Sequence, residues 1–194
     1  MSPCPNPSDR PDAAPDPGRP LVTDTWLPPE EYVRTIPHAS VYACALMTDQ
    51  HENPLHLRSS IPQHPQRWQW PGGNLDESGS TPWQTAVRET WEETGLQLLG
   101  PPRLLAVHFM VPSATWPIAK VGFLFDGGSL SAAQLDSIRL RPAEHDHWEV
   151  RPLGQWQRDM RPRHWRLLKA AYAARRTGTT LYLSDADEAD VPAD

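Results

Sequence analysis

Residues 72–96 read GGNLDESGSTPWQTAVRETWEETGL, and this stretch carries an unusually complete set of helix signals. Thr81 is a natural N-cap, and Gln84, three residues later, completes a capping-box pattern. Pro82 stands at the first helical position, where its missing N–H has no partner to lose. Gly95 can adopt the left-handed conformation that ends a helix. The sequence therefore predicts a short helix that begins at Pro82 and ends before Gly95.

The spacing of side chains along this helix separates an apolar face from an acidic one. At about 100° per residue, the carboxylates of Glu89, Glu92 and Glu93 converge on one side. The other side is suited to the core and contains Trp83, Ala86, Val87, Thr90, Trp91 and Thr94. The helix is therefore expected to pack through the second face and to present three carboxylates on the first.

The acidic face lies near the C-terminus of the helix, where the macrodipole favours cations. Glu89 and Glu93 are also a like-charge i,i+4 pair, which costs roughly 0.2–0.5 kcal/mol, and Arg88 offsets only part of it. An ordinary solvated surface is one interpretation, since acidic faces are common. A divalent cation is the other, because Mg²⁺ and Mn²⁺ prefer carboxylate oxygens and also bind the oxygens of a diphosphate.

The rest of the body reads as strands and one further helix, in an irregular order. We expect residues 55–58 to pair with a strand at 40–47, and Asp126-Gly127-Gly128 to form a turn. Residues 164–176 carry the apolar stripe of an amphipathic helix. An α/β fold with a mixed β-sheet covered by helices follows from this order. The predicted strands are 40–47, 55–58, 68–70, 103–111, 120–125 and, more weakly, 147–150.

Composition divides the 194 residues into a leader, a body and a tail. Residues 1–22 are rich in Pro, Asp and Ser and residues 184–194 are acidic, so both segments are predicted to be disordered. A single domain is expected at residues 23–183. No apolar run suits a membrane span or a signal peptide, and Cys4 and Cys44 are not expected to pair. These features predict a cytoplasmic protein without a membrane partner.

The formal net charge of −6 argues against a nucleic-acid polymer as partner, because backbone binding needs a dense basic face. Small anions are compatible with this charge. No Gly-x-Ser-x-Gly turn is present, nor a phosphate-cradling loop that ends in Lys-Ser or Lys-Thr. The oligomeric state is open between a monomer and a homodimer.

Residues 72–96 resemble the box of the Nudix hydrolase family, whose pattern is Gly, five residues, Glu, seven residues, then Arg-Glu-aliphatic-x-Glu-Glu-x-Gly-aliphatic. Gly73, preceded by Trp70-Pro71-Gly72, resembles the start of the box. The strand order around it is similar to the family's α/β/α sandwich with a mixed β-sheet. In the second half of the box, six residues stand in the family's order and spacing: Arg88, Glu89, Glu92, Glu93, Gly95 and Leu96.

Three features depart from the family's pattern. Gly73 lies one residue too far from Arg88, which implies an insertion in the loop before the helix. The first glutamate of the box falls on Ser80, although Glu77 in the longer loop can reach the same space. The resemblance implies that this glutamate supports the arginine, so its loss bears on catalytic efficiency more than on metal binding. Thr90 fills the aliphatic slot, which suits the helix if its hydroxyl bonds back to the backbone.

The resemblance implies hydrolysis of a phosphoanhydride bond in a nucleoside diphosphate derivative, by in-line attack of water on phosphorus with Mg²⁺ or Mn²⁺. Nucleotides, ADP-ribose and nucleotide sugars all fit this description. The implied main ligands are Glu92 and Glu93, and the Gly73 carbonyl completes the shell. Glu89 is then a third ligand or the base, and Arg88 orients the carboxylates.

Further site candidates lie outside the box. In some family members the base comes from a later loop, and Glu144 has a suitable position, although an exposed polar loop is the more ordinary interpretation. His145 and His147 have an i,i+2 spacing that suits a second metal site or, more simply, a surface pair. Arg58 and Lys120 are expected to contact phosphates. Trp70 is expected to stack on a base, and the other candidates for that role are Trp68, Trp116 and Trp148.

A second functional class stays open beside the enzyme, namely a catalytically weak nucleotide-binding or regulatory module that keeps the fold. The best support for this class is Ser80, which stands where the family's box has its first glutamate. Retention of the three helix glutamates and Arg88 favours the enzyme, because a degenerate site has no need of a destabilising acidic cluster.

Overall fold

A computed structural model describes residues 26–64, 66–76, 80–114 and 116–185. The chain divides into two units, Met1–Pro37 and His38–Asp194. The described part of the first unit contains one short helix, α1 (Pro29–Tyr32), which buries none of its side chains. The predicted disordered leader at residues 1–22 lies outside the described residues, as do residues 186–194 of the predicted tail. Within the described residues, we find no helix with the length and apolar character of a membrane span.

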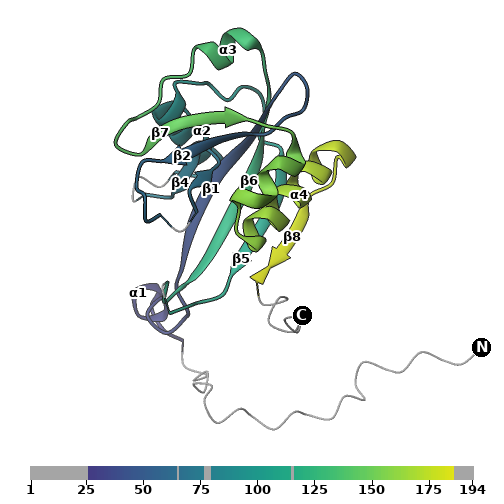
Figure 1. Cartoon of the computed structure of the whole chain (residues 1–194). Coiled ribbons are helices and arrows are strands. Elements are labelled where there is room, and N and C mark those ends of the chain that lie inside the picture. Colours follow the sequence, from purple (N-terminus) through teal and green to yellow (C-terminus); the bar gives the residue numbers. More distant parts are fainter. Residues whose placement is uncertain (1–25, 65, 77–79, 115, 186–194) are drawn as a thin grey trace, which may run out of the picture. The chain divides into compact units, whose positions relative to one another are not determined.

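The second unit is built on a mixed five-stranded sheet with the order β4-β1-β6-β5-β8 (Figure 1). β1 runs parallel to β6 and β5 parallel to β8, whereas the β1–β4 and β5–β6 pairs are antiparallel. The predicted α/β class with a mixed sheet is therefore confirmed. The strands are β1 (Ala39–Asp49), β4 (Gly72–Asn74), β5 (Leu104–Met110), β6 (Ala119–Leu130) and β8 (Leu181–Ser184).

A second, three-stranded antiparallel sheet has the order β3-β2-β7. It consists of β2 (Leu55–Ser59), β3 (Trp68–Gln69) and β7 (His145–Val150). The predicted pairing of residues 55–58 with 40–47 is wrong, because β1 is already flanked by β4 and β6. β1 meets the segment before β2 through an isolated bridge between Thr48 and Pro54.

β6 continues through the residues predicted to form a turn. Leu46 of β1 pairs with Asp126, and the next pair is Thr48 with Ser129, so Gly127 and Gly128 stand opposite a single residue. Gly128 has a φ of 81°, in the left-handed region that favours glycine. A side chain at Gly127 would collide with the Met47 side chain. The two glycines therefore form a β-bulge, which leaves the strand intact.

Helices cover opposite faces of the five-stranded sheet, because alternate residues of β1 point to opposite sides (Figure 1). Cys44 and Leu46 pack with α4 (Pro162–Thr177), which confirms the predicted helix at 164–176. Ala43, Ala45 and Met47 pack with α2 (Pro82–Thr94). In the chain, α3 (Ala132–Asp136) follows β6, and the 3-10 helix η2 (Leu153–Asp159) follows β7.

The ends of α2 are those that the sequence predicts. The Thr81 side chain accepts a hydrogen bond from the Gln84 N–H, and the Gln84 side chain accepts one from the Thr81 N–H. Gly95 follows the helix with a φ of 73°. The caps therefore fix both the start and the end of the helix that carries the acidic residues.

The buried face of α2 differs from the predicted one. Trp91 is 53% exposed, whereas Thr85 and Glu93 are buried. The residues that face the sheet are mostly small, so the helix can lie close to β1, and the bulky Trp91 is left outside. The buried residues of the helix are Thr85, Ala86, Thr90, Glu93 and Thr94.

His56 of β2 is fully buried among aromatic rings. Its ring centroid lies 4.4 Å from that of Trp156 and 5.4 Å from that of Trp70. Burial lowers the pKa of His56 to about 3, and the positive charge of Arg151 and the neighbouring His164 add to this effect. An unfolded histidine titrates near pH 6.5, so the folded chain binds fewer protons than the unfolded chain between these two values.

The contribution of neutral His56 to the free energy of unfolding should therefore be complete above about pH 6.5. It should decrease as the pH is lowered towards about 3. We expect His56→Phe to show a shallower loss than the wild type between about pH 7 and about pH 4.5, because it removes one group that must stay neutral. Urea unfolding at several pH values measures the slope. His38→Gln changes an exposed histidine and is the control. Equal slopes for His56→Phe and the wild type would contradict the prediction.

Candidate metal and substrate site

Glu93, in the last turn of α2, is held at both carboxylate oxygens. Its Oε2 accepts a hydrogen bond from the Gly72 N–H at 3.0 Å. Its Oε1 lies 3.1 Å from Nε2 of His145. Glu93 is only 6% exposed, so these contacts satisfy a carboxylate that would otherwise be costly to bury. The prediction that all three glutamates face away from the core is therefore wrong for Glu93.

Glu89 lies one turn earlier, against the backbone of β4. A Cβ atom built on Gly73 would lie 2.5 Å from its Oε1. Arg88 lies 2.9 Å from the same oxygen. Burial raises the pKa of the Glu89 carboxyl, Arg88 offsets part of this, and the charges of Glu93 and Glu92 raise it further. A bound cation would relieve this repulsion between neighbouring carboxylates.

Arg88 lies among the carboxylates. Besides Glu89 it contacts Glu92 at 3.5 Å and Asp76 at 3.4 Å. Asp76 was not singled out from the sequence. Arg141 lies 3.7 Å from the other oxygen of Glu92 and 3.2 Å from Glu144. Two arginines therefore lie against the acidic group on the side of α2 and of the loop before β7.

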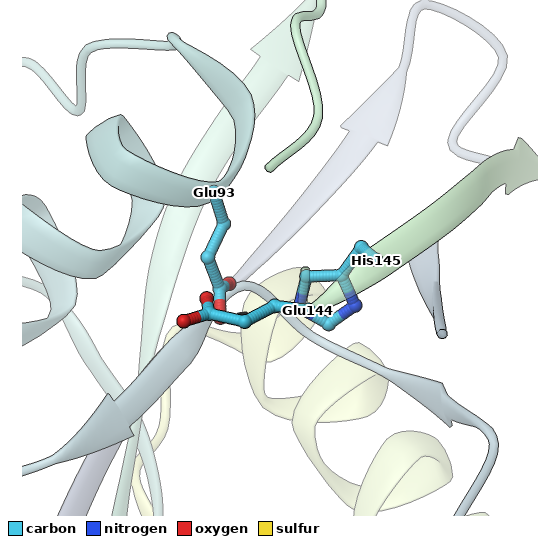
Figure 2. A group of neighbouring side chains, drawn as sticks. All are labelled: Glu93, Glu144 and His145. Atoms are coloured by element: carbon cyan, nitrogen blue, oxygen red, sulfur yellow. Dashed lines mark ion pairs between the residues drawn. The ribbon is translucent and has the colours of Figure 1, made fainter. Parts of the chain in front are cut away.

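Glu144 and His145 join Glu93 at the start of β7 (Figure 2). One ligand atom from each of the three residues lies within 4.8 Å of the others. This donor set, two carboxylates and one imidazole, fits a divalent cation. The predicted candidate Glu144 is thus placed beside the helix glutamates.

His145 and His147 do not lie together, although their spacing suits one face of a regular strand. Arg58 pairs with His147 and Ser59 with His145, so Asp146 is an extra residue in β7. This bulge turns His145 inwards, where it is 4% exposed. His147 is exposed and lies 3.2 Å from Glu149.

A cavity of about 630 Å³ adjoins this acidic group. Gly72 and Gly73 line it, and the same two glycines contact Glu93 and Glu89. Aromatic rings and cationic side chains form much of its remaining wall. These are Tyr42, Trp68, Trp70, Trp116, Lys120 and Arg163.

Lys120, a predicted substrate contact, lies within the aromatic wall of the cavity. Its Nζ is 4.8 Å from the ring centroid of Tyr42 and 5.0 Å from that of Trp116. Burial lowers the pKa of Lys120. Next to it, His108 joins the Tyr42 hydroxyl at 3.5 Å to a carboxylate oxygen of Asp185 at 2.7 Å.

The other predicted substrate contacts are placed differently. Trp70 lines the cavity and is largely buried. Arg58 is in the three-stranded sheet, where its Nε donates a hydrogen bond to Asp146 at 2.7 Å, and it does not line this cavity. Glu77, the predicted substitute for the missing glutamate of the box, lies outside the described residues.

A family model described as a NUDIX domain matches residues 36–171. The chain belongs to the Nudix family. The resemblance seen in residues 72–96 is therefore confirmed at the level of the family. Nudix enzymes generally use a divalent metal, and the donor set around Glu93 agrees with that.

Several proteins are similar to this Nudix chain. An RNA pyrophosphohydrolase of Rhizobium meliloti (strain 1021) is 32% identical over 105 residues, which cover 46% of this chain and 60% of that relative. The match therefore spans less than two thirds of the relative's length.

Among solved structures, a MutT protein from Methanosarcina mazei Go1 has a TM-score of 0.57 at 21% identity, covering 72% of this chain and 96% of its own. An Ap4A hydrolase from C. elegans has a TM-score of 0.52 at 23% identity, covering 72% and 98%. These likenesses confirm the Nudix fold.

Thr90 fills the aliphatic slot of the box, and its hydroxyl is buried without a hydrogen-bond partner in the part of the chain that the structure describes. The expected bond back to the helix is absent. Thr90→Val should therefore raise the free energy of unfolding by roughly 1–2 kcal/mol, because it removes an unpaired buried hydroxyl at nearly constant volume.

Thr94→Val is the matched control, since Thr94 is equally buried in the same helix. Its hydroxyl donates to the Thr90 carbonyl at 2.5 Å and accepts from the Leu96 N–H at 3.1 Å. This variant should lose roughly 1–2 kcal/mol in urea unfolding. A loss of stability in both variants would contradict the explanation.

Gly73→Ala should displace the Glu89 carboxylate, because the added Cβ occupies its position. We expect Mn²⁺ affinity to fall by about tenfold with little change in melting temperature, since the displaced group is the end of a flexible side chain. Isothermal titration calorimetry measures the affinity. Gly154→Ala is the control, because a Cβ there meets nothing within 4 Å. Unchanged Mn²⁺ binding in Gly73→Ala would argue against Glu89 as part of the metal site.

Proposed function

We propose that this Nudix chain hydrolyses a phosphoanhydride bond in a nucleoside diphosphate derivative, with Mg²⁺ or Mn²⁺ as the cation. One observation carries the proposal. Gly72 and Gly73 contact the carboxylates of Glu93 and Glu89 on one side and line the 630 Å³ cavity on the other. A diphosphate that reaches the glutamates can therefore place its nucleoside in the cavity.

Each acidic residue has a proposed role. Glu92 and Glu93 are the main ligands, and the Gly73 carbonyl completes the shell. A bound divalent cation would neutralise charge on the phosphate oxygens and lower the pKa of the attacking water. Arg88 holds the carboxylates in place through its contacts with Glu89 and Glu92.

Two carboxylates can accept the proton of the attacking water. Glu89 lies against Gly73 at the rim of the cavity, and Glu144 lies beside Glu93. Either carboxylate would serve as the base for a water that the bound cation would hold. Replacing each by glutamine separates the two roles, because loss of the base lowers kcat while loss of a ligand also lowers metal affinity.

The cavity suits a small nucleotide derivative. Trp70 and Trp116 offer aromatic surface for a base, and Lys120 offers a positive charge for a phosphate. Arg58 is a further phosphate contact if its pair with Asp146 opens on binding. The net charge of −6 favours a small substrate over a nucleic-acid polymer. We propose a cytoplasmic location for the chain.

Two proteins similar to this chain suggest further compounds for the substrate panel. A dinucleoside polyphosphate follows from the likeness to an Ap4A hydrolase. An oligoribonucleotide with a 5′-triphosphate follows from the RNA pyrophosphohydrolase relative. Nucleoside triphosphates, ADP-ribose and nucleotide sugars complete the panel.

The test is phosphate release from this panel with Mg²⁺ and then Mn²⁺, with added phosphatase to expose monophosphate products. We expect metal-dependent turnover that falls by at least about a hundredfold in Glu93→Gln, because a ligand of the cation is lost. Glu31→Gln, a change at an exposed glutamate of α1, is the control and should retain full activity.

If neither Mg²⁺ nor Mn²⁺ supports turnover, the proposal that the chain is a hydrolase is refuted. If a panel compound then raises the melting temperature of the wild type and of Glu93→Gln alike, the chain is a nucleotide-binding module. Turnover that is equal in Glu93→Gln and the wild type would refute the proposed site.

A further inference from the structure

The imidazole of His145 is part of the acidic site, although no residue of the Nudix box predicts it. His145 is the first residue of β7 and is buried, and its Nε2 lies 3.1 Å from Oε1 of Glu93. The other oxygen of Glu93 is occupied by the Gly72 N–H. Oε1 and Nε2 are therefore the two atoms that this pair presents to a cation.

The spacing of these atoms is that of neighbouring ligands on one ion. Two ligand atoms at right angles, each roughly 2.1 Å from a cation, are roughly 3 Å apart. A carboxylate oxygen of Glu144 lies within 4.8 Å of one ligand atom of Glu93 and one of His145, which leaves room for a third ligand on the same ion. Figure 2 shows the three side chains converging from α2 and from the start of β7.

The backbone holds the ring of His145 in this position. The bulge at Asp146 turns the side chain inwards, and the His145 N–H donates to the Arg141 carbonyl at 2.9 Å. Nδ1 is buried without a hydrogen-bond partner among the described residues. The ring therefore contacts polar groups of the site through Nε2.

We infer that His145 supplies a nitrogen ligand, through Nε2, to the cation held by Glu93 and Glu144. Mg²⁺ prefers oxygen ligands, whereas imidazole suits first-row transition metals. The site should therefore bind a transition-metal ion such as Mn²⁺ more tightly than Mg²⁺. This inference rests on the proposed metal site and adds His145, with Glu144 beside it, to the ligands proposed there.

Mn²⁺ is a suitable probe because pulsed electron paramagnetic resonance detects nitrogen nuclei bonded to it. The full chain is loaded with less than one equivalent of Mn²⁺, so that the tightest site is filled first. We expect nitrogen coupling in the wild type, its loss in His145→Gln, and its retention in His147→Gln. Glutamine keeps an N–H that can donate to Glu93, so the first variant removes the nitrogen ligand while preserving hydrogen bonding.

Calorimetry on the same proteins gives a second readout. His145→Gln should weaken Mn²⁺ binding by about tenfold or more and Mg²⁺ binding by less, so the preference for Mn²⁺ shrinks. Should His145→Gln fail to fold, isotope-labelled histidine in the wild-type chain assigns the coupled nitrogen to a histidine, and His147→Gln excludes the neighbouring residue.

Absence of nitrogen coupling in the wild type, or its persistence in His145→Gln, would overturn the inference and leave His145 as a hydrogen-bond partner of Glu93. Metal-dependent turnover without nitrogen coupling defeats this inference alone. Nitrogen coupling without turnover of any panel compound defeats the proposed hydrolase and leaves the metal site standing.

Discussion

The hydrogen bond from the Gly72 N–H to the Glu93 carboxylate joins the last turn of α2 to β4, and the site depends on it. A buried carboxylate is stable only where polar partners replace the lost water, and Gly72 and His145 supply them. Only glycine fits at position 72, because a side chain would collide with the backbone of β1 at Ala43 and Cys44. The two contacts of this one carboxylate therefore fix the helix, the glycine edge and the histidine relative to one another.

The same glycine edge separates two environments with opposite electrostatic character. On one side, the glutamates of α2 and Glu144 concentrate negative charge, which Arg88 and Arg141 balance only in part. On the other side, the cavity places Lys120 against two aromatic rings. The acidic group and the aromatic wall of the cavity therefore meet across a strand of three residues, β4.

The three-stranded sheet contributes to the site through β7. Pairing of β7 with β2 places the bulge at Asp146 beside the acidic group, and His56 and the rings of Trp68, Trp70 and Trp156 pack behind it. The aromatic cluster and the residues of the acidic group at the start of β7 are thus joined by one sheet.

Sequence by itself determined the limits of α2 and the spacing of its glutamates, because capping and helical periodicity act over a few neighbouring residues. The tertiary structure alone decided which strands β2 pairs with, since the edges of β1 were already occupied. It also decided that Trp91 faces solvent and that Glu93 is buried against His145, because close packing on β1 selects the small residues of α2. β8 and the contact of Asp185 with His108 follow likewise from pairing with β5, which no local pattern near residue 181 specifies.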